Sequence, residues 1–315
     1  MKTAQRQHSW VHLVALLTVL ATFPLLFVGG LVTSTGSALA VPDWPTTFGH
    51  NMFLFPWSRM VGGILYEHSH RLLGALVGCL TILLCLGLWL RETRPWLRWL
   101  GTVALAAVML QGVLGGLRVI LLQHTLAIVH ACLAQAFFAL LVGIACFTAP
   151  QHDTSPTEPE APDLGRLRGL CVVTTALIYV QVVFGAIVRH TGIRLDAHLL
   201  LAGLVALHIL ALNMSVWMSV WRHHVEQSAI VRPVMLLSVL LMVQLSLGLG
   251  AYLVKSTALT SMVTSFARIG LTTTHLAVGS LMLVTSLVLT LRTYHLGAAP
   301  RPDLARRVLS QQVSL

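Results

Sequence analysis

Long uncharged apolar runs alternate with short charged segments along almost the whole chain. Eight of these runs are long enough to cross a bilayer, which needs about 20 apolar residues. They lie at about 11–32, 72–90, 99–117, 125–148, 169–188, 197–221, 233–254 and 269–291. The pattern therefore predicts an all-α membrane protein with eight transmembrane helices, in direct contact with membrane lipid.

The composition agrees with this class of protein. Hydrophobic residues make up 56% of the chain and charged residues only 10%, whereas about 25% of the residues in an ordinary soluble domain are charged. A disordered chain is excluded, and a soluble globular protein is disfavoured. The net charge is +10, but the basic residues are scattered rather than gathered in one segment, so no nucleic-acid partner is expected.

The orientation in the membrane follows from the Lys and Arg residues in the loops. The first apolar run, about 22 residues, exceeds the 7–15 residues of a signal-peptide core, so we interpret it as a retained helix. With the N-terminus inside, 13 of the 20 Lys and Arg residues fall on the inner side. The positive-inside rule then predicts that both termini are cytoplasmic. No mitochondrial presequence is recognisable, so the predicted location is the cell (inner) membrane of a bacterium.

Segment 149–168 differs from its surroundings. It holds four prolines and four of the ten acidic residues, a composition typical of a solvated linker. It separates an N-terminal unit, residues 1–150, from a C-terminal unit, residues 169–315, with the cytoplasmic linker at 151–168. Glycine-rich segments and histidines recur in the same order in both units, which predicts two pseudo-symmetric four-helix bundles built from a parallel repeat.

Four of the 15 histidines lie at the outer ends of the even-numbered spans: His70, His130, His198 and His275. An ionisable side chain inside a membrane is a functional candidate by default. Two imidazoles from different helices of a bundle can bind one iron from opposite faces, so all four are predicted metal ligands, two for a haem in each unit. The alternative is that they only bond backbone carbonyls or water. His208 lies deeper and has no partner at its depth.

One acidic residue accompanies the first of these histidines. Glu67 and His70 are three residues apart and share a helix face. The second unit offers only Asp196, two residues before His198, which does not reproduce that spacing. This asymmetry predicts one reactive haem site and one electron-transfer haem. The alternative for Glu67 is a surface ion pair with Arg71, four residues later.

Several segments of the first unit resemble the haem A synthase family. Residues 35–37 (TGS) and 42–45 (PDWP) look like a loop of that family, and Glu67-x-x-His70-Arg71 resembles its ExxHR motif. The run QGxxGG at residues 111–116 also fits. The resemblance covers the whole chain and is strongest in residues 29–130.

The resemblance implies an enzyme that oxidises the C8 methyl of haem O to a formyl group, giving haem A for terminal oxidases. It implies that His70 and His130 flank the substrate haem, that His198 and His275 bind a haem b, that Glu67 is the catalytic carboxylate and that Arg71 contributes to cofactor binding. Glu67 either stabilises positive charge at the oxidised methyl or orients an attacking water. Haem O synthase and a terminal oxidase are the protein partners such an activity suggests.

The chain departs from the family pattern in its cysteines. Many members have a cysteine just before the PDWP segment, where this chain has Val41, and a second one after it. All five cysteines here lie in apolar spans, so no extracellular disulfide is expected and the chain resembles a cysteine-lacking member. The aromatic loop 33–66 is expected to lie on the membrane and cover the first haem site.

Two other functions remain open at the level of the sequence. A dihaem b-type membrane cytochrome would carry electrons through the same histidines without methyl oxidation, and Glu67 would be dispensable. A transporter built from parallel repeats would bind no haem, and the near absence of charged residues at mid-membrane positions disfavours it.

Overall fold

Eight long helices make up most of the computed structural model, which describes residues 9–150, 164–223, 228–256 and 263–296. They are α2 (Ser9–Ser34), α3 (Gly63–Arg91), α4 (Pro95–Leu121), α5 (His124–Thr148), α6 (Leu164–Thr191), α7 (Leu195–His223), α8 (Ser228–Ser256) and α9 (Ser265–Leu296). All eight are long and apolar enough to cross a membrane. This confirms the predicted spans and fits a multi-pass membrane protein. Most of the predicted linker, and both chain ends, lie outside the described residues.

The helices satisfy their own polar groups, as a lipid environment requires. Backbone hydrogen bonds are internal to each helix, and buried hydroxyls donate to a carbonyl one turn earlier. Thr22 donates to Thr18 O at 2.6 Å and Thr81 donates to Val77 O at 2.7 Å. These polar side chains can therefore face the protein interior without an unpaired hydroxyl.

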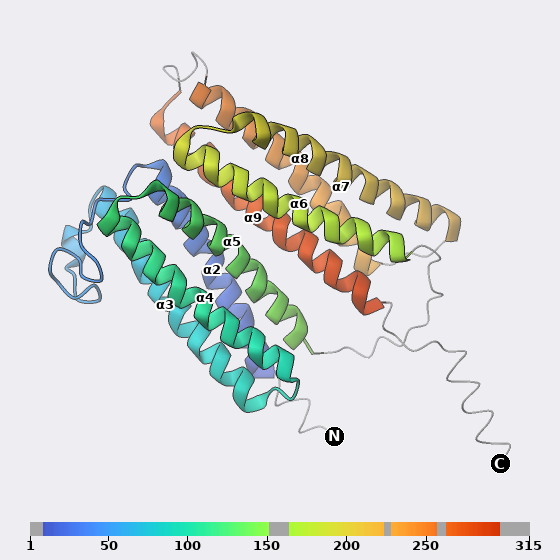
Figure 1. The fold of residues 1–315 in the computed structure, drawn as a ribbon, viewed down its shortest axis with the longest axis horizontal. Helices are drawn as coiled ribbons and strands as arrows, with labels where there is room; N and C mark the ends of the chain where they lie inside the picture. Colours follow the sequence, from blue (N-terminus) through green and yellow to red (C-terminus); the bar gives the residue numbers. More distant parts are fainter. Residues whose placement is uncertain (1–8, 151–163, 224–227, 257–262, 297–315) are drawn as a thin grey trace.

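The helices form two groups, α2–α5 and α6–α9, which are distinct in Figure 1. Within the first group, contacts run from α2 to α3, α4, α5 and back to α2; within the second they run in the same way from α6 to α7, α8, α9 and back to α6. The groups meet where α2 and α5 contact α9 and where α5 contacts α6. Each helix thus has the same neighbours within its group as its counterpart has in the other.

Each group has a hydrophobic core of its own. Leu84, Leu97 and Leu141 belong to a buried cluster in the first group, and Ile209, Leu237 and Leu289 belong to one in the second. A smaller cluster of Phe138, Val142 and Val284 lies between the groups. The helices of a group are therefore held mainly by burial within that group.

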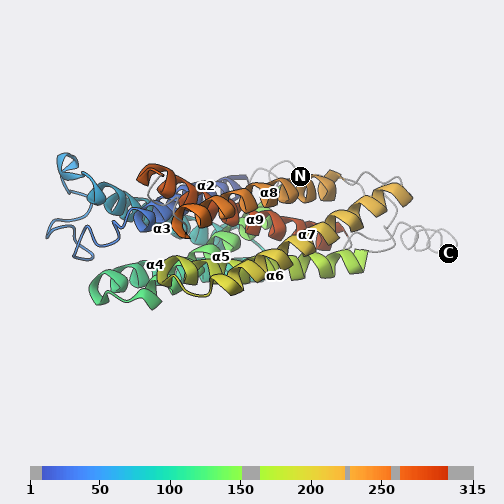
Figure 2. The same ribbon diagram turned by 90° about the horizontal axis from the view of Figure 1, so that it is seen from above.

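Residues 35–62 form a loop between α2 and α3, which we call the 35–62 loop. It extends beyond the helix ends at one end of the molecule (Figures 1 and 2) and contains the short 3-10 helix η1 (Trp57–Arg59). Within the loop, Val41, Thr47 and Phe55 are buried, whereas Phe53 and Trp57 are exposed. Its position on a membrane surface remains a prediction, with which these exposed aromatic side chains agree.

The turn between α3 and α4 is fastened by an ion pair. Arg94 Nη2 lies 2.8 Å from Glu92 Oε2 and also donates to Phe147 O at 2.8 Å. The hydrogen bond from the Arg94 guanidinium, reinforced by the N–H groups of Arg94 and Thr93, outweighs burial and lowers the pKa of Glu92 to about 2. This turn therefore joins three helices of the first group through one ionised carboxylate.

Candidate functional site

The four predicted histidines come together as two pairs of side chains. His70 of α3 and His130 of α5 have ring centroids 6.5 Å apart and ring planes at 75°. His198 of α7 and His275 of α9 have centroids 6.4 Å apart and planes at 76°. The first pair and the second pair, as we call them, therefore have nearly the same geometry.

Each of these imidazoles lies against a glycine of a neighbouring helix. A Cβ added at the glycine would lie 2.9 Å from His70 Cε1 at Gly29, 3.4 Å from His130 Cε1 at Gly115, 3.2 Å from His198 Cε1 at Gly185 and 3.0 Å from His275 Cε1 at Gly248. A larger residue would crowd or displace the ring at most of these positions. The glycines leave the space that the histidines occupy.

The surroundings of the four rings are alike in a second respect. Nδ1 of each is buried without a hydrogen-bond partner of regular geometry. Each ring instead interacts electrostatically with the carbonyl four residues before its glycine, at Leu25, Gln111, Gln181 and Gln244. A nearby carbonyl acting on one ring nitrogen is typical of an imidazole whose other nitrogen binds a metal.

Glutamines join the helices beside three of the histidines, and the sequence analysis missed this role. Gln111 Nε2 donates to His130 O at 3.1 Å, and Gln181 Nε2 donates to His198 O at 3.0 Å. Gln244 Nε2 lies 3.4 Å from His275 Nε2. The spacing Gln-x-x-x-Gly recurs at 111–115, 181–185 and 244–248, and this recurrence was the signal that could have revealed them.

The donor set of each pair fits a haem better than a bare metal ion. Across the described part of the chain, no group of three or more His, Cys, Asp or Glu side chains could hold a metal ion. A haem supplies its own four nitrogens and needs only axial ligands. Metal–imidazole bonds are about 2 Å long, so two axial imidazoles on one iron have centroids roughly 6 Å apart, close to the separations found here.

Glu67 and Arg71 form an ion pair at the first pair, but the pair is not on the surface. Glu67 is 4% exposed. Its Oε1 accepts a hydrogen bond from Arg71 Nη2 at 2.8 Å, and its Oε2 accepts one from the Val41 N–H at 2.9 Å. The carboxylate is thus fixed between α3 and the 35–62 loop, and the alternative of a surface ion pair does not describe it.

Arg71 is directed at the loop rather than at an open surface. Its Nη1 donates to Asp43 O at 2.7 Å and to Thr46 O at 2.9 Å, and its Nη2 donates to Val41 O at 3.0 Å. With the bond to Glu67, both terminal nitrogens of the guanidinium are engaged. A planar fork of donors suits this task, because it can hold several loop carbonyls at once.

The carboxylate of Asp43 links two parts of the 35–62 loop by accepting hydrogen bonds from residues further along it. Burial raises the pKa of this carboxyl, but hydrogen bonds from the Gly49 N–H, the Thr46 hydroxyl and the Phe48 N–H outweigh burial and lower the pKa to about 2. The N–H donors lie at 2.9 Å and 2.7 Å. A carboxylate that accepts several hydrogen bonds is stabilised in its charged form.

His68 anchors the loop and points away from the first pair, as its spacing from His70 predicts. Its Nδ1 lies 3.1 Å from Thr47 Oγ1, and its ring centroid lies 5.1 Å from that of Phe55. The side chain is almost fully buried beneath the loop. Of the two neighbouring histidines, only His70 belongs to a pair.

The 35–62 loop packs against α4 through Trp44. The indole lies so close to α4 that a Cβ added at Gly116 would be 2.3 Å from it. The preceding residue, Gly115, faces His130. The loop therefore contacts α4 at the residue after the glycine that faces His130, and its covering of the first site stays a prediction.

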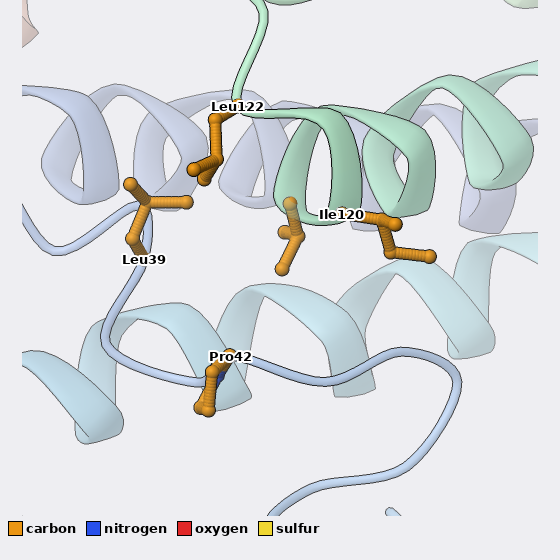
Figure 3. A pocket seen from close by; sticks show the side chains of 5 residues that line it. Leu39, Pro42, Ile120 and Leu122 are labelled. Atoms are coloured by element: carbon orange, nitrogen blue, oxygen red, sulfur yellow. The ribbon is translucent and has the colours of Figure 1, made fainter.

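A hollow of about 330 Å³ remains between the loop and the end of α4. Figure 3 shows Leu39 and Pro42 from the loop, Ile120 from α4 and Leu122 directly after α4 around it, and Val119 completes the lining. All five side chains are apolar. The lining of this hollow thus carries no charged side chain.

Arg118 supplies a positive charge at the first pair. It lies one residue before Val119 on α4 and interacts electrostatically with Glu67, His70 and His130. His190 of α6 interacts with Arg118 and His130 as well. The first site therefore borders a cluster of basic side chains from both helix groups.

The second pair has a simpler setting. The connection between α6 and α7 is only residues 192–194. Asp196 is 75% exposed and lies 3.9 Å from Arg194. It is therefore unlike the buried Glu67, so the two sites differ in their acidic residue, and the roles predicted from that difference stay a prediction.

Two further groups have no part in either pair. A ring nitrogen of His208 lies 3.0 Å from Leu204 O in the same helix. The five cysteines are free and lie in the helices.

Comparison with known proteins agrees with the site. A sequence profile of the family described as cytochrome oxidase assembly protein matches residues 12–197, more than half of the chain. The chain belongs to this family. The matched part includes the 35–62 loop, Glu67 and the first pair, and it ends one residue before His198.

Three bacterial relatives of this family carry the name Heme A synthase. The protein of Shouchella clausii is 30% identical over 189 residues, which are 59% of this chain and 61% of the relative. That of Halalkalibacterium halodurans is 27% identical over 191 residues, 58% of this chain and 61% of the relative. That of Geobacillus kaustophilus is 27% identical over 197 residues, 60% and 58% of the two chains. The chain thus spans about three fifths of the length of these relatives.

Proposed function

We propose that the protein is a haem A synthase, an oxidoreductase that converts the C8 methyl of haem O to a formyl group. The observation that carries this proposal is the buried carboxylate of Glu67 beside one of two closely matching histidine pairs. The names of the relatives and the membership of a cytochrome oxidase assembly family support it.

In this proposal His70 and His130 hold the substrate haem, and His198 and His275 hold a haem b that carries electrons. The matching ring separations and the glycine opposite each ring support both assignments. The bound haems supply the redox chemistry. The basic cluster around Arg118 suits the carboxylate groups at the edge of a haem.

Glu67 is the proposed catalytic carboxylate. Its two oxygens are held by Arg71 and Val41, so its direction is fixed before the substrate arrives. Each carboxylate oxygen keeps a further lone pair, which can accept a hydrogen bond from a water or face positive charge at the oxidised methyl. The 35–62 loop above it excludes bulk water, so such electrostatic effects are strong.

The arrangement in the membrane is part of the same proposal. Residues 1–150 and 169–315 form two pseudo-symmetric four-helix units joined by residues 151–168, with both termini in the cytoplasm of a bacterium and the protein in its inner membrane. The same order of helix contacts in both groups supports the repeat, and the distribution of Lys and Arg supports the orientation. Haem O synthase and a terminal oxidase are the proposed protein partners.

The second candidate is a dihaem b-type membrane cytochrome without methyl oxidation. It is favoured by one observation: both oxygens of Glu67 are used to hold Arg71 and the loop. In that case the carboxylate has a structural role only.

Haem extraction with mass analysis distinguishes the two. Cells that make haem O are compared with and without the protein, and with the Glu67→Gln variant. Haem A that appears with the native chain and falls about 100-fold or more with Glu67→Gln is the expected result. The matched control is Asp196→Asn, which changes an exposed carboxylate near the second pair and leaves haem A unchanged. Bound haem without any haem A would favour the cytochrome.

A further inference from the structure

Arg189, in the last turn of α6, joins both helix groups with one side chain. Its Nη2 donates to Gly30 O at 2.7 Å and to Ser34 Oγ at 2.6 Å, both in α2. Its Nη1 donates to Thr272 O of α9 at 3.2 Å. The guanidinium therefore lies where α2, α6 and α9 meet.

This position is between the two histidine pairs. Gly30 follows Gly29, which faces His70 of the first pair. Thr272 precedes His275 of the second pair by three residues, which places them on one face of α9. Arg189 also interacts electrostatically with His275. Its charge is thus close to the second pair, and its hydrogen bonds reach the backbone beside the first.

The positive charge of Arg189 has no acidic partner among the described residues. The ion pairs found there involve Arg71, Arg94 and Arg194. The groups that accept hydrogen bonds from Arg189 are neutral carbonyls and a hydroxyl, and that hydroxyl, of Ser34, in turn bonds Thr272 and Thr273 at 3.0 Å. An unpaired charge among helices is screened less than one in water, so it acts on neighbouring groups more strongly.

Arg189 has no charged counterpart at the equivalent position of the first helix group. Arg189 follows Gly185 by four residues, and the residue that follows Gly29 by four is Thr33. Thr33 donates to Gly29 O in its own helix at 3.2 Å and carries no charge. The two groups therefore differ at equivalent positions next to their first glycine.

We propose that Arg189 is a positioning residue that raises the reduction potential of the haem at the second pair. The inference rests on the proposed function, because it requires a haem between His198 and His275. One-electron reduction of a haem iron from the ferric to the ferrous state lowers its positive charge by one unit. A fixed cation nearby repels the ferric form more than the ferrous form, so it favours reduction. Arg189 thereby makes the second haem a better electron acceptor than it would be without this charge.

The test is a spectroelectrochemical titration of the full-length, haem-loaded protein, with the second haem assigned by comparison with a His70→Ala chain. Arg189→Gln removes the charge and keeps an amide donor. Arg189→Lys keeps the charge and loses the planar fork. Arg268→Gln is the matched control: Arg268 is a partly exposed cation of the same helix as His275, and its Nη2 donates to Ser265 Oγ at 3.1 Å.

The expected result is a lower midpoint potential of the second haem in Arg189→Gln, with the native midpoint in Arg189→Lys and Arg268→Gln. An unchanged midpoint in Arg189→Gln overturns the inference, and so does an equal fall in Arg189→Lys, which would trace the effect to packing. If Arg189→Gln does not retain haem, the midpoint potential of the second haem is measured in Arg189→Lys instead. A native midpoint potential there supports the role of the charge, and a lowered midpoint potential overturns the inference. A native chain without any bound haem would overturn the proposed function itself.

Discussion

The first and second histidine pairs have nearly equal geometry but very different surroundings. Both pairs show ring separations close to 6.5 Å and a glycine opposite each ring. Among the described residues, only the first has a long loop above it and a buried carboxylate beside it, whereas the second has a three-residue connection between α6 and α7 and an exposed Asp196. The helices thus provide the same ligand arrangement twice, and the loop with Glu67 accounts for what is particular to the first site.

The charged residues near the two pairs also differ. Arg118 and Arg71 lie on the side of the first pair, where Arg71 is paired with Glu67. Arg189 lies close to the second pair without an acidic partner among the described residues. In the proposed function, one helix scaffold would thus hold two haems in different electrical environments, as a reactive site and an electron carrier require.

The largest expected effect is the selective loss of one haem. In the proposed function, His130→Ala removes one axial ligand of the first haem, and His275→Ala removes one of the second. If the native protein holds two haems, as proposed, each variant is expected to retain about one haem per chain, because a single imidazole cannot hold the iron from both faces. Pyridine haemochrome analysis of the purified chains measures the ratio. Loss of both haems from each variant would show that the two sites are not independent.

A smaller effect is expected from filling the glycine contacts. Gly29→Ala and Gly248→Ala place a methyl group 2.9 Å and 3.0 Å from Cε1 of His70 and His275. Overpacking of this kind typically costs about 1–3 kcal/mol, so each variant should bind haem more weakly at its own site and normally at the other. Haem retention during dilution in detergent reports this. The control is Gly112→Ala, where a Cβ meets no atom within 4 Å, and equal losses in the control would refute the role of the contacts.

The next prediction compares the 35–62 loop with the three-residue connection between α6 and α7. Arg71→Gln removes the fork that holds Val41, Asp43 and Thr46. Charge-assisted hydrogen bonds contribute about 1.5–3 kcal/mol each, so protease cleavage in the 35–62 loop should become at least tenfold faster. Arg194→Gln, at the short connection, is the control and should be cut as slowly as the native chain. An Arg71→Gln loop as resistant as the native one would mean that other contacts suffice.

The smallest expected effect is the loss of loop stabilisation at low pH, when Asp43 is protonated. Its pKa is about 2 in the folded loop against an ordinary value of 3.8. Because the folded pKa is depressed, the stabilisation is complete above about pH 4 and is lost as the pH falls toward 2. Tryptophan fluorescence of the loop should therefore be constant from neutral pH down to about 4 and change below it. In Asp43→Asn this change should be absent, and a transition near pH 6 in the native chain would point to another group.

The spans and the pairing of histidines could be predicted because both follow from local rules. A bilayer fixes the length of an uncharged run, and helix starts fix the depth of His70, His130, His198 and His275. The partners of Glu67 could not be predicted beyond Arg71, since Val41 lies 26 residues away in an irregular loop. Arg189 bonds Gly30 across 159 residues. Such contacts depend on how whole helices pack, which residue spacing does not reveal.

The way in which the 35–62 loop is held has a consequence for how the protein matures. Arg71, Glu67, Asp43 and His68 fasten it by hydrogen bonds, and it contains no cysteine. The attachment of the loop to the helices is therefore noncovalent and reversible. It needs no thiol oxidase and does not respond to thiol reductants. The first site can form as soon as its helices assemble, whatever the redox state of the compartment that the loop faces.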